Sequence, residues 1–247
     1  MVDPRRAESF GTCAAEYDRH RPRYPSELVA GLVDRDGIRV LDVGAGTGIA
    51  SAQLLETGAD VTAVEPDPRM ANIAADKGIR VEVATFEDWQ PDGRSFDLVV
   101  FAQSFHWVQP RLALDKVARI LSAGGRLVLL SNRITPTAPT RSDLEEVYAD
   151  YLPASKRPDV DAVHNDELMV TIKESGFTVE RRSCVEWLHY STNDWLDLVF
   201  TYSSHLMLDP AARKQLRSRL EDRIGETGVH ARNDATAVVC VAARAGA

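Results

Sequence analysis

One glycine-rich turn constrains the fold of this chain more than any other feature. Residues 39–43 form an apolar run, Arg-Val-Leu-Asp-Val, that is typical of a strand buried on both faces. Residues 44–48 then read Gly-Ala-Gly-Thr-Gly, and a helical stretch over residues 49–56 follows at once. Glycine adopts positive φ without strain and lets a ligand approach the backbone, and the first N–H groups of a helix attract polar and negative groups. The sequence therefore predicts a ligand-binding turn between a buried strand and a helix.

Short β-rich runs alternate with helical stretches through the first half of the chain. After the first strand, the predicted strands cover residues 61–65, 80–84, 97–102 and 126–130. The predicted helices cover residues 49–56, 68–77 and 110–121, and a turn is expected at residues 123–125. Strands and helices that alternate at this spacing predict a parallel sheet with right-handed crossovers.

The second half follows another pattern. Residues 131–176 read as a long, mostly helical insertion that carries Pro136, Pro139, Pro153 and Pro158. A sixth strand is predicted over residues 177–190, helices over 193–206 and 209–225, and a final β-rich run over 235–244. The last strands therefore come from distant parts of the chain, which is compatible with an antiparallel strand inserted at one edge of the sheet.

Glu65 ends the second predicted strand, at the edge of the sheet where ligands of open α/β folds bind. Its two carboxylate oxygens are suited to accept hydrogen bonds from both hydroxyls of a ribose, so an adenosine-type ligand fits this plan. A nicotinamide dinucleotide favours the spacing G-x-G-x-x-G, with glycines against the pyrophosphate. The spacing here is G-x-G-x-G, which suits a ligand with no pyrophosphate whose amino-acid tail lies against the turn.

A series of segments resembles the class I S-adenosylmethionine-dependent methyltransferases. Residues 40–48 are similar to the cofactor-binding motif of that family, and Glu65-Pro66-Asp67 to its acidic second motif. Residues 82–89 resemble the segment that brackets adenine, residues 96–107 the fourth-strand motif, and residues 120–127 the turn into the fifth strand. The motifs stand in family order, and an ordered series is far more specific than any one of its members.

The alternation of elements and this resemblance together predict the fold class. We expect an α/β fold with a Rossmann-like, doubly wound, mostly parallel sheet of seven strands, an antiparallel edge strand and a helical lid. A single methyltransferase domain is expected over residues 1–247. Within it we expect an N-terminal helical cap over residues 1–36, a cofactor-binding core over 37–130, and helical lid or substrate insertions over 131–176 and 191–230.

Two further segments resemble a small-molecule branch of the family that includes trans-aconitate methyltransferase-like proteins. They are residues 17–25, Tyr-Asp-Arg-His-Arg-Pro-Arg-Tyr-Pro, and residues 105–107, Phe-His-Trp. By that resemblance Tyr17 and Arg21 close over the methionine end of the cofactor. An arginine suits this position because its parallel N–H donors grip a carboxylate. A surface-packed helix whose arginines face solvent is the alternative that the sequence leaves open.

The resemblance implies S-adenosyl-L-methionine as the cofactor and a set of residues that bind it. The set comprises Tyr17, Arg21, Gly44, Ala45, Gly46, Gly48, Glu65, Pro66, Phe86, Glu87 and Gln103. Within the adenine-bracketing segment, either Asp88 or Glu87 is expected to hydrogen-bond the adenine amino group, with the adjacent backbone as the alternative.

His106 is the candidate catalytic residue. It follows the fourth predicted strand, and histidine has an unperturbed pKa near 6.5, which suits a general base. Methyl transfer needs such a base only when the acceptor carries a proton that must leave. A histidine that merely fixes its loop by a hydrogen bond is the alternative. The neighbouring Phe105 and Trp107 are suited to a cation–π contact with a sulfonium, although packing is the more common role for aromatic residues.

The acidic composition narrows the class of partner. The chain has 29 Lys and Arg against 37 Asp and Glu, a formal net charge of -8, which argues against broad binding to nucleic acid or to an anionic membrane. Its three cysteines are scattered without metal-ligand spacing, which indicates free thiols and no metal site. We expect a cytoplasmic protein whose partner is a small-molecule methyl acceptor, and the oligomeric state stays open.

The leading hypothesis is methyl transfer from S-adenosylmethionine to a small molecule by in-line displacement. A nicotinamide-dependent oxidoreductase is the alternative enzyme, although the glycine spacing and the divergent second half argue against it. A non-catalytic S-adenosylmethionine-binding protein is a third hypothesis, which the intact turn and Glu65 make less favourable. An RNA or protein substrate is a fourth, disfavoured because phosphate contacts need clustered Lys and Arg.

Overall fold

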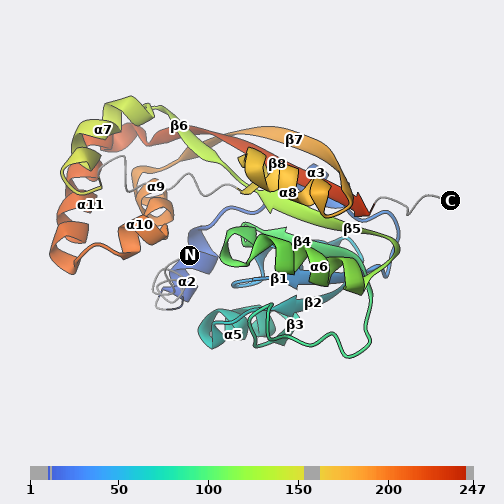
Figure 1. Ribbon diagram of the computed structural model, residues 1–247. Helices are drawn as coiled ribbons and strands as arrows, with labels where there is room; N and C mark the ends of the chain where they lie inside the picture. Colours follow the sequence, from blue (N-terminus) through green and yellow to red (C-terminus); the bar gives the residue numbers. More distant parts are fainter. Residues whose placement is uncertain (1–10, 12, 153–161, 243–247) are drawn as a thin grey trace. The chain divides into compact units, whose positions relative to one another are not determined.

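The computed structural model describes residues 11, 13–152 and 162–242 (Figure 1). Pro153 and Pro158 of the predicted insertion lie outside these residues, as do the first ten residues of the predicted cap. The chain divides into two compact units. The sheet unit comprises Arg23–Asn132, Val160–Cys184 and Ala235–Ala247, and the helix-rich unit comprises Met1–Pro22, Arg133–Asp159 and Val185–Asp234.

Five parallel strands form the centre of the sheet unit. They are β1 (Arg39–Val43), β2 (Asp60–Val64), β3 (Arg80–Glu82), β4 (Phe96–Ala102) and β5 (Leu121–Ser131), in the spatial order β3-β2-β1-β4-β5. The strand β8 (Val229–Ala242) pairs antiparallel with β5. The chain turns outward in opposite directions from β1 and β4, so the carboxyl ends of these two strands mark the topological switch point.

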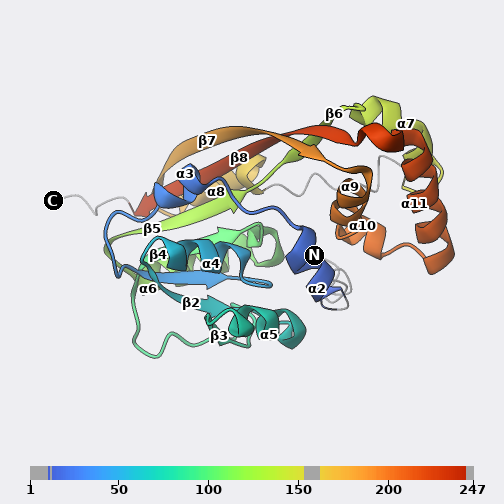
Figure 2. The same ribbon diagram turned by 180° about the vertical axis from the view of Figure 1, so that it is seen from behind.

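Helices cover both faces of this sheet because the strands are apolar on both sides. One face packs on α3 (Ser26–Ala30) and α4 (Ile49–Glu56), and the other packs on α6 (Pro110–Ile120) and α8 (Asp166–Glu174). Figures 1 and 2 show these two pairs of helices from opposite sides. Along β1 the buried side chains alternate, with Val40 in the α3–α4 core and Leu41 in the α6–α8 core. The helix α5 (Pro68–Asp76) packs beside β3, and Asp67 caps its first turn by accepting the Arg69 N–H at 2.9 Å.

The helix-rich unit is built from segments far apart in sequence. Its regular elements are α2 (Ala14–His20), β6 (Ile134–Ala138), α7 (Arg141–Ala149), α9 (Thr192–Val199), α10 (Ser203–Leu206) and α11 (Pro210–Ile224). The helix α11 packs on α7 and α9, around a core that includes Leu144, Leu196 and Leu220. β6 pairs antiparallel with the first residues of β8, from Ile134 opposite Asn233 to Ala138 opposite His230. The strands β7 (Phe177–Tyr190) and β8 each contribute residues to both units.

The predicted fold class is confirmed, because the sheet is mostly parallel, doubly wound and edged by antiparallel pairing. The predicted strands over the first half coincide with β1 to β5, and the helices with α4, α5 and α6. The roles of the cap and lid segments, and the expectation of a single domain, stay predictions.

Four details differ from the sequence-based expectation. Within the described residues the sheet has eight strands, one more than the seven expected. The additional strand is β6, in a segment expected to be mostly helical; Pro136 lies in it, and a proline within a sheet is typical of an edge strand.

The strand β8 begins at Val229, earlier than expected, because the exposed His230, Arg232 and other polar residues hide its alternation. The turn expected at residues 123–125 is instead an irregularity within β5, where the register with β4 shifts. The helix expected over 193–206 is split in two, and the Thr201 hydroxyl closes the first half by donating to the Leu198 carbonyl at 2.6 Å.

Three short 3-10 helices complete the described chain. They are η1 (Phe105–Trp107), η3 (Ala162–His164) and η4 (Gly225–Thr227). The first follows β4 and therefore carries the candidate catalytic residue to the carboxyl edge of the sheet.

Candidate functional site

The glycine turn joins β1 to α4, as predicted, and all three of its glycines have positive φ, between 59° and 79°. The N–H groups of Gly44 and Ala45 both donate to the Val64 carbonyl, at 2.8 and 3.2 Å, so the turn is tied to the end of β2. A Cβ on Gly44 would lie 2.7 Å from the Ser104 Cβ, and one on Gly48 would lie 2.5 Å from the Ile79 Cδ1. The fold itself therefore requires glycine at these two positions.

Gly46 differs from its two neighbours in the turn. A Cβ built on Gly46 meets only the flexible end of Met70, at 3.4 Å, so close packing does not explain this glycine. Its N–H donates to Glu65 Oε2 at 2.8 Å. The middle of the turn thus has positive φ and room for a neighbouring group, as close approach by a ligand requires.

Glu65 is 7% exposed, and both of its carboxylate oxygens accept backbone N–H groups. Oε2 accepts from Gly46, and Oε1 accepts from Asp67 at 2.9 Å. Burial raises the pKa of this carboxyl group, against the lowering effect of the two hydrogen bonds. Each carboxylate oxygen can accept more than one hydrogen bond, so the predicted contact with ribose hydroxyls stays a prediction compatible with this geometry.

Two buried polar atoms in and next to the turn have no hydrogen-bond partner among the described residues. They are Asp42 Oδ1, at the end of β1, and Thr47 Oγ1, in the turn itself. The other Asp42 oxygen accepts from the Ser51 hydroxyl at 2.6 Å, and burial raises the pKa of this carboxyl group to about 6. Unsatisfied buried polar atoms are rare in native proteins, and their presence here fits a turn built to receive a polar ligand.

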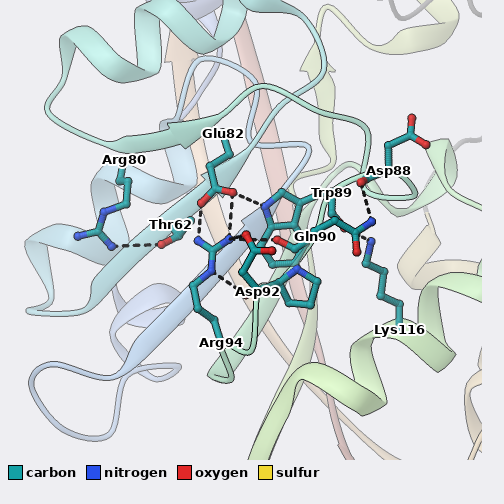
Figure 3. Close-up of polar contacts among 10 residues, drawn as sticks. Thr62, Arg80, Glu82, Asp88, Trp89, Gln90, Asp92, Arg94 and Lys116 are labelled. Atoms are coloured by element: carbon teal, nitrogen blue, oxygen red, sulfur yellow. Dashed lines mark hydrogen bonds and ion pairs between the residues drawn. The ribbon is translucent and has the colours of Figure 1, made fainter.

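The segment from residue 83 to residue 95, which we call the β3–β4 loop, is held by a compact network (Figure 3). The Glu82 carboxylate accepts from the Trp89 indole N–H at 2.6 Å and forms a two-point ion pair with Arg94. The hydrogen bonds from Arg94 hold the pKa of Glu82 below its usual value. The Arg94 guanidinium also lies 5.2 Å from the Trp89 ring centroid.

The predicted adenine-binding residues occupy different places in this loop. Phe86 is buried, and its ring meets that of Phe101 edge-on at 5.5 Å, so its aromatic surface serves the core. Glu87 is exposed, whereas the Asp88 carboxylate accepts from the Thr85 hydroxyl at 2.9 Å. Their predicted contacts with adenine stay predictions.

The end of β4 brings a second group of predicted residues to the carboxyl edge of the sheet. Gln103 is exposed, has φ of 56°, and donates its side-chain N–H to the Asn132 carbonyl at 3.1 Å. The Ser104 hydroxyl donates to the Val43 carbonyl, which joins the ends of β4 and β1 beneath Gly44. The His106 ring, partly buried, lies 4.7 Å from the Trp107 ring. The backbone thus carries Gln103 and His106 to the same edge as the glycine turn, while their predicted roles stay predictions.

Tyr17 and Arg21 belong to the helix-rich unit. The Arg21 guanidinium lies between two aromatic rings, 4.8 Å from the Tyr17 centroid and 4.3 Å from the Tyr202 centroid. Its terminal N–H donates to the Thr201 carbonyl at 3.3 Å. Burial raises the pKa of Tyr202, which remains a neutral phenol against the cation. Arg21 is therefore held by its neighbours and is not one of the solvent-facing arginines of the alternative interpretation. Its contact with the cofactor stays a prediction.

Two findings concern metals and membranes. In the described parts of the chain, no group of three or more His, Cys, Asp or Glu side chains is arranged to hold a metal ion. Among the helices that the structure describes, none is both long and apolar enough to cross a bilayer.

Comparison with known proteins gives a consistent result. The family model described as a methyltransferase domain matches residues 41–129, which cover the glycine turn, Glu65 and β4. An uncharacterized methyltransferase of Mycobacterium tuberculosis is 36% identical over 218 residues, which cover 87% of this chain and 84% of that relative. A ubiquinone biosynthesis O-methyltransferase of Xanthomonas axonopodis is 29% identical over 62% of this chain and 68% of its own length.

Solved structures share the fold at low sequence identity. A protein from Anaeromyxobacter dehalogenans, assigned as a type II methyltransferase, superposes with a TM-score of 0.66 and 19% identity, over 90% of this chain and 97% of that one. A phosphoethanolamine N-methyltransferase of Haemonchus contortus, bound to S-adenosylhomocysteine, superposes with a TM-score of 0.55 and 14% identity, over 95% of this chain and 58% of its own.

Proposed function

Because this chain belongs to the class I S-adenosylmethionine-dependent methyltransferases, we propose that it methylates a small-molecule acceptor with the cofactor held at its glycine turn. The observation that carries the proposal is the junction of Gly46 and Glu65 at the topological switch point of the sheet. This junction holds a buried carboxylate at the edge where ligands of such folds bind, and the unsatisfied buried polar atoms of Asp42 and Thr47 belong to the same turn and the strand before it.

In this proposal, different residues of the sheet unit contact different parts of the cofactor. Gly44, Ala45, Gly46 and Gly48 provide the backbone against which its amino-acid end lies. Glu65 accepts the ribose hydroxyls, with Pro66 beside it, and the β3–β4 loop with Phe86 and Glu87 borders the adenine. Gln103 contacts the cofactor from the end of β4. S-adenosylmethionine supplies a methyl group already activated by a sulfonium, so the protein's tasks are to align the acceptor and exclude water.

His106 serves as the general base in this proposal when the acceptor carries a proton that must leave. The placement of η1 directly after β4 supports the assignment, because this strand ends at the switch point. Tyr17 and Arg21 are proposed to contact the methionine end, on the strength of the sequence resemblance. Membership of the trans-aconitate methyltransferase-like branch likewise stays a prediction.

A small-molecule acceptor is favoured over a nucleic acid by the net charge of -8, which repels phosphate groups. The ubiquinone biosynthesis O-methyltransferase relative is named for a small-molecule pathway, which supports the same class of acceptor for this chain. The acceptor's identity and the atom that receives the methyl group are separate questions for experiment.

Calorimetric titration of the purified full chain tests the cofactor assignment. We expect S-adenosylmethionine and S-adenosylhomocysteine to bind, and NAD and NADP not to bind at the same concentrations. Tight dinucleotide binding without S-adenosylmethionine binding would sink the proposal in favour of an oxidoreductase.

A methyl-transfer screen tests the acceptor class. S-adenosylhomocysteine release is measured with carboxylic acids, phenols, amines and RNA as acceptors. We expect turnover with a small molecule and none with RNA. Turnover with RNA alone would contradict the small-molecule proposal, whereas turnover with any acceptor excludes a protein that only binds the cofactor.

A further inference from the structure

We propose that Lys116 is a positioning residue that holds the β3–β4 loop in the form that receives the adenine end of the cofactor. This role rests on the proposed function, because it presupposes an adenosine-type ligand at Glu65. Lys116 lies on α6, far from the loop in sequence, and nothing in its local sequence indicates a role in ligand binding.

The Lys116 ammonium group meets three backbone carbonyls at once. Nζ donates to the carbonyl of Phe86 at 2.5 Å, to that of Glu87 at 3.2 Å, and to that of Trp89. An ammonium group has three N–H donors, so the three acceptors use its full capacity. Nζ also lies 4.9 Å from the Phe86 ring centroid and 5.5 Å from that of Trp89. One side chain therefore sets the direction of three of the seven carbonyls between residues 85 and 91.

The remaining carbonyls of the same stretch are also satisfied within the protein. Thr85 accepts the Trp89 N–H at 2.9 Å, and Asp88 accepts the Gln90 side-chain amide at 3.0 Å. The carbonyls of Gln90 and Pro91 accept from Arg94, at 3.1 and 2.8 Å. Figure 3 shows Lys116 and Arg94 reaching this stretch from different sides.

Every carbonyl from residue 85 to residue 91 thus has a donor, although the stretch contains no regular helix or strand. Two cations provide five of these seven contacts. A loop ordered in this way binds a ligand without first losing conformational freedom, which is the energetic benefit of a preformed site.

The loop leaves the sheet directly beside the proposed ribose acceptor. β3 pairs parallel with β2, with Glu82 opposite Val64, and the Glu65 N–H donates to the Glu82 carbonyl at 3.2 Å. The Lys116 contacts begin four residues beyond Glu82. Disorder in the loop would therefore act on the part of the site next to the ribose.

The helix that carries Lys116 is a rigid support. Its side chains Ala113, Leu114 and Val117 are buried in the α6–α8 core, so the helix cannot shift without breaking that packing.

Burial lowers the pKa of Lys116, Arg119 lowers it further, and Glu87 and Asp88 oppose both effects. The ammonium consequently loses its proton at a lower pH than an exposed lysine, which provides a measurable signature.

The test uses the full chain and two probes, S-adenosylhomocysteine and 5′-methylthioadenosine, which contains the adenosine part without the amino-acid end. For Lys116→Met we expect roughly tenfold weaker binding of both probes by calorimetry, corresponding to the loss of loop preorganisation. Arg119→Met is the matched control, because it removes a charge from the exposed side of the same helix. We expect it to change neither affinity by more than about twofold.

A pH series separates positioning from general stability. As pH rises from neutrality toward 10.5, the ordinary lysine pKa, we expect the wild-type affinity for methylthioadenosine to fall as Lys116 loses its proton. Lys116→Arg, whose guanidinium stays charged, should retain part of the wild-type affinity and show no such fall. The comparison of the wild type with Lys116→Arg tests the positioning role even if Lys116→Met does not fold.

These experiments distinguish failure of the Lys116 positioning role from failure of the proposed function. If the wild-type protein binds neither probe, the proposed function fails. If it binds both, and Lys116→Met binds them equally well, the positioning role is overturned while the proposed function stands. A pH dependence that is identical in the wild type and Lys116→Arg also overturns it.

Discussion

At the scale of residues, one carboxylate, that of Glu65, connects the segments of the candidate site. Glu65 joins Gly46, in the turn after β1, to Asp67, at the start of α5, through two backbone hydrogen bonds. Hydrogen bonds to an ionised group are stronger than neutral ones, so this side chain shapes the turn before any ligand arrives. The same side chain therefore has a structural task and a proposed binding task.

Glu65→Ala removes the proposed ribose acceptor. We expect at least roughly tenfold weaker binding of S-adenosylhomocysteine, because charge-assisted hydrogen bonds of about 1.5–3 kcal/mol each are lost. Asp60→Ala, at the exposed start of β2, the strand that Glu65 follows, is the matched control and should leave the affinity unchanged. Calorimetry on both variants, after circular dichroism confirms folding, makes the comparison. Unchanged affinity in Glu65→Ala would refute the ribose role.

His106→Ala tests the proposed base once an acceptor with a removable proton is found. We expect turnover to fall about 10²–10⁴-fold, the usual contribution of a general base, with cofactor affinity retained. His164→Ala, an exposed histidine of the same unit, is the control and should remain active. Single-turnover kinetics measures the chemical step directly. Full activity of His106→Ala would leave His106 the role of fixing its loop.

At the scale of elements, the strand–turn–helix unit of β1 and α4 was the most predictable part of the molecule. Its signals are local: an apolar run, three glycines at fixed spacing and a helical stretch. The β3–β4 loop was only partly predictable, because its conformation depends on Lys116, a residue of α6 that meets it only in the folded chain. Likewise, β6 escaped prediction because its pairing with β8 joins segments far apart in sequence. Local patterns thus predicted elements, and contacts over long sequence separations decided the rest.

Two glycine substitutions within the turn should differ in how strongly they affect stability and ligand binding. Gly48→Ala adds a Cβ 2.5 Å from Ile79 at positive φ, so we expect a loss of about 2–4 kcal/mol of unfolding free energy. Gly46→Ala meets only Met70, so its cost should stay near about 1 kcal/mol while S-adenosylhomocysteine affinity falls markedly. Urea unfolding and calorimetry on both variants measure the two quantities. Equal effects on both quantities would contradict the separate tasks assigned to these glycines.

At the scale of the whole molecule, the fold class was predictable and the division of the chain was not. Alternating β-rich and helical stretches indicated the doubly wound sheet, since buried parallel strands read as apolar runs. The helix-rich unit draws on three separate stretches of sequence, and no local signal shows that they pack together. Arg21 illustrates this, because its partner Tyr202 lies 181 positions further along the chain.

Stability at the whole-molecule scale should depend on pH through Asp42. Burial raises the pKa of Asp42 from 3.8 to about 6, so between these values the folded protein keeps a proton that the unfolded chain releases. The contribution of this group to stability therefore falls as pH rises through that window and stays low above it, by up to about 3 kcal/mol.

Asp42→Asn, which cannot ionise, should remove that pH dependence. We expect the variant to be more stable than the wild type at pH 8 and equal to it near pH 4, where Asp42 is protonated. Urea unfolding at both pH values measures the difference, and Asp60→Asn, an exposed carboxylate of β2, is the control. If the stability difference between Asp42→Asn and the wild type does not change with pH, then Asp42 ionises as readily in the folded protein as in the unfolded chain, and the expectation is wrong.

The position of β8 has a consequence for how the protein is made. On the ribosome, β5 is complete at Ser131, but its antiparallel partner begins only at Val229. Six consecutive residues of that partner, Ala235 to Cys240, are buried in the folded chain. Throughout the synthesis of the intervening residues, the nascent sheet therefore presents an open, apolar edge to the crowded surroundings of the ribosome. Chaperone binding to ribosome-bound chains is accordingly expected to persist until β8 emerges, long after the glycine turn has been translated.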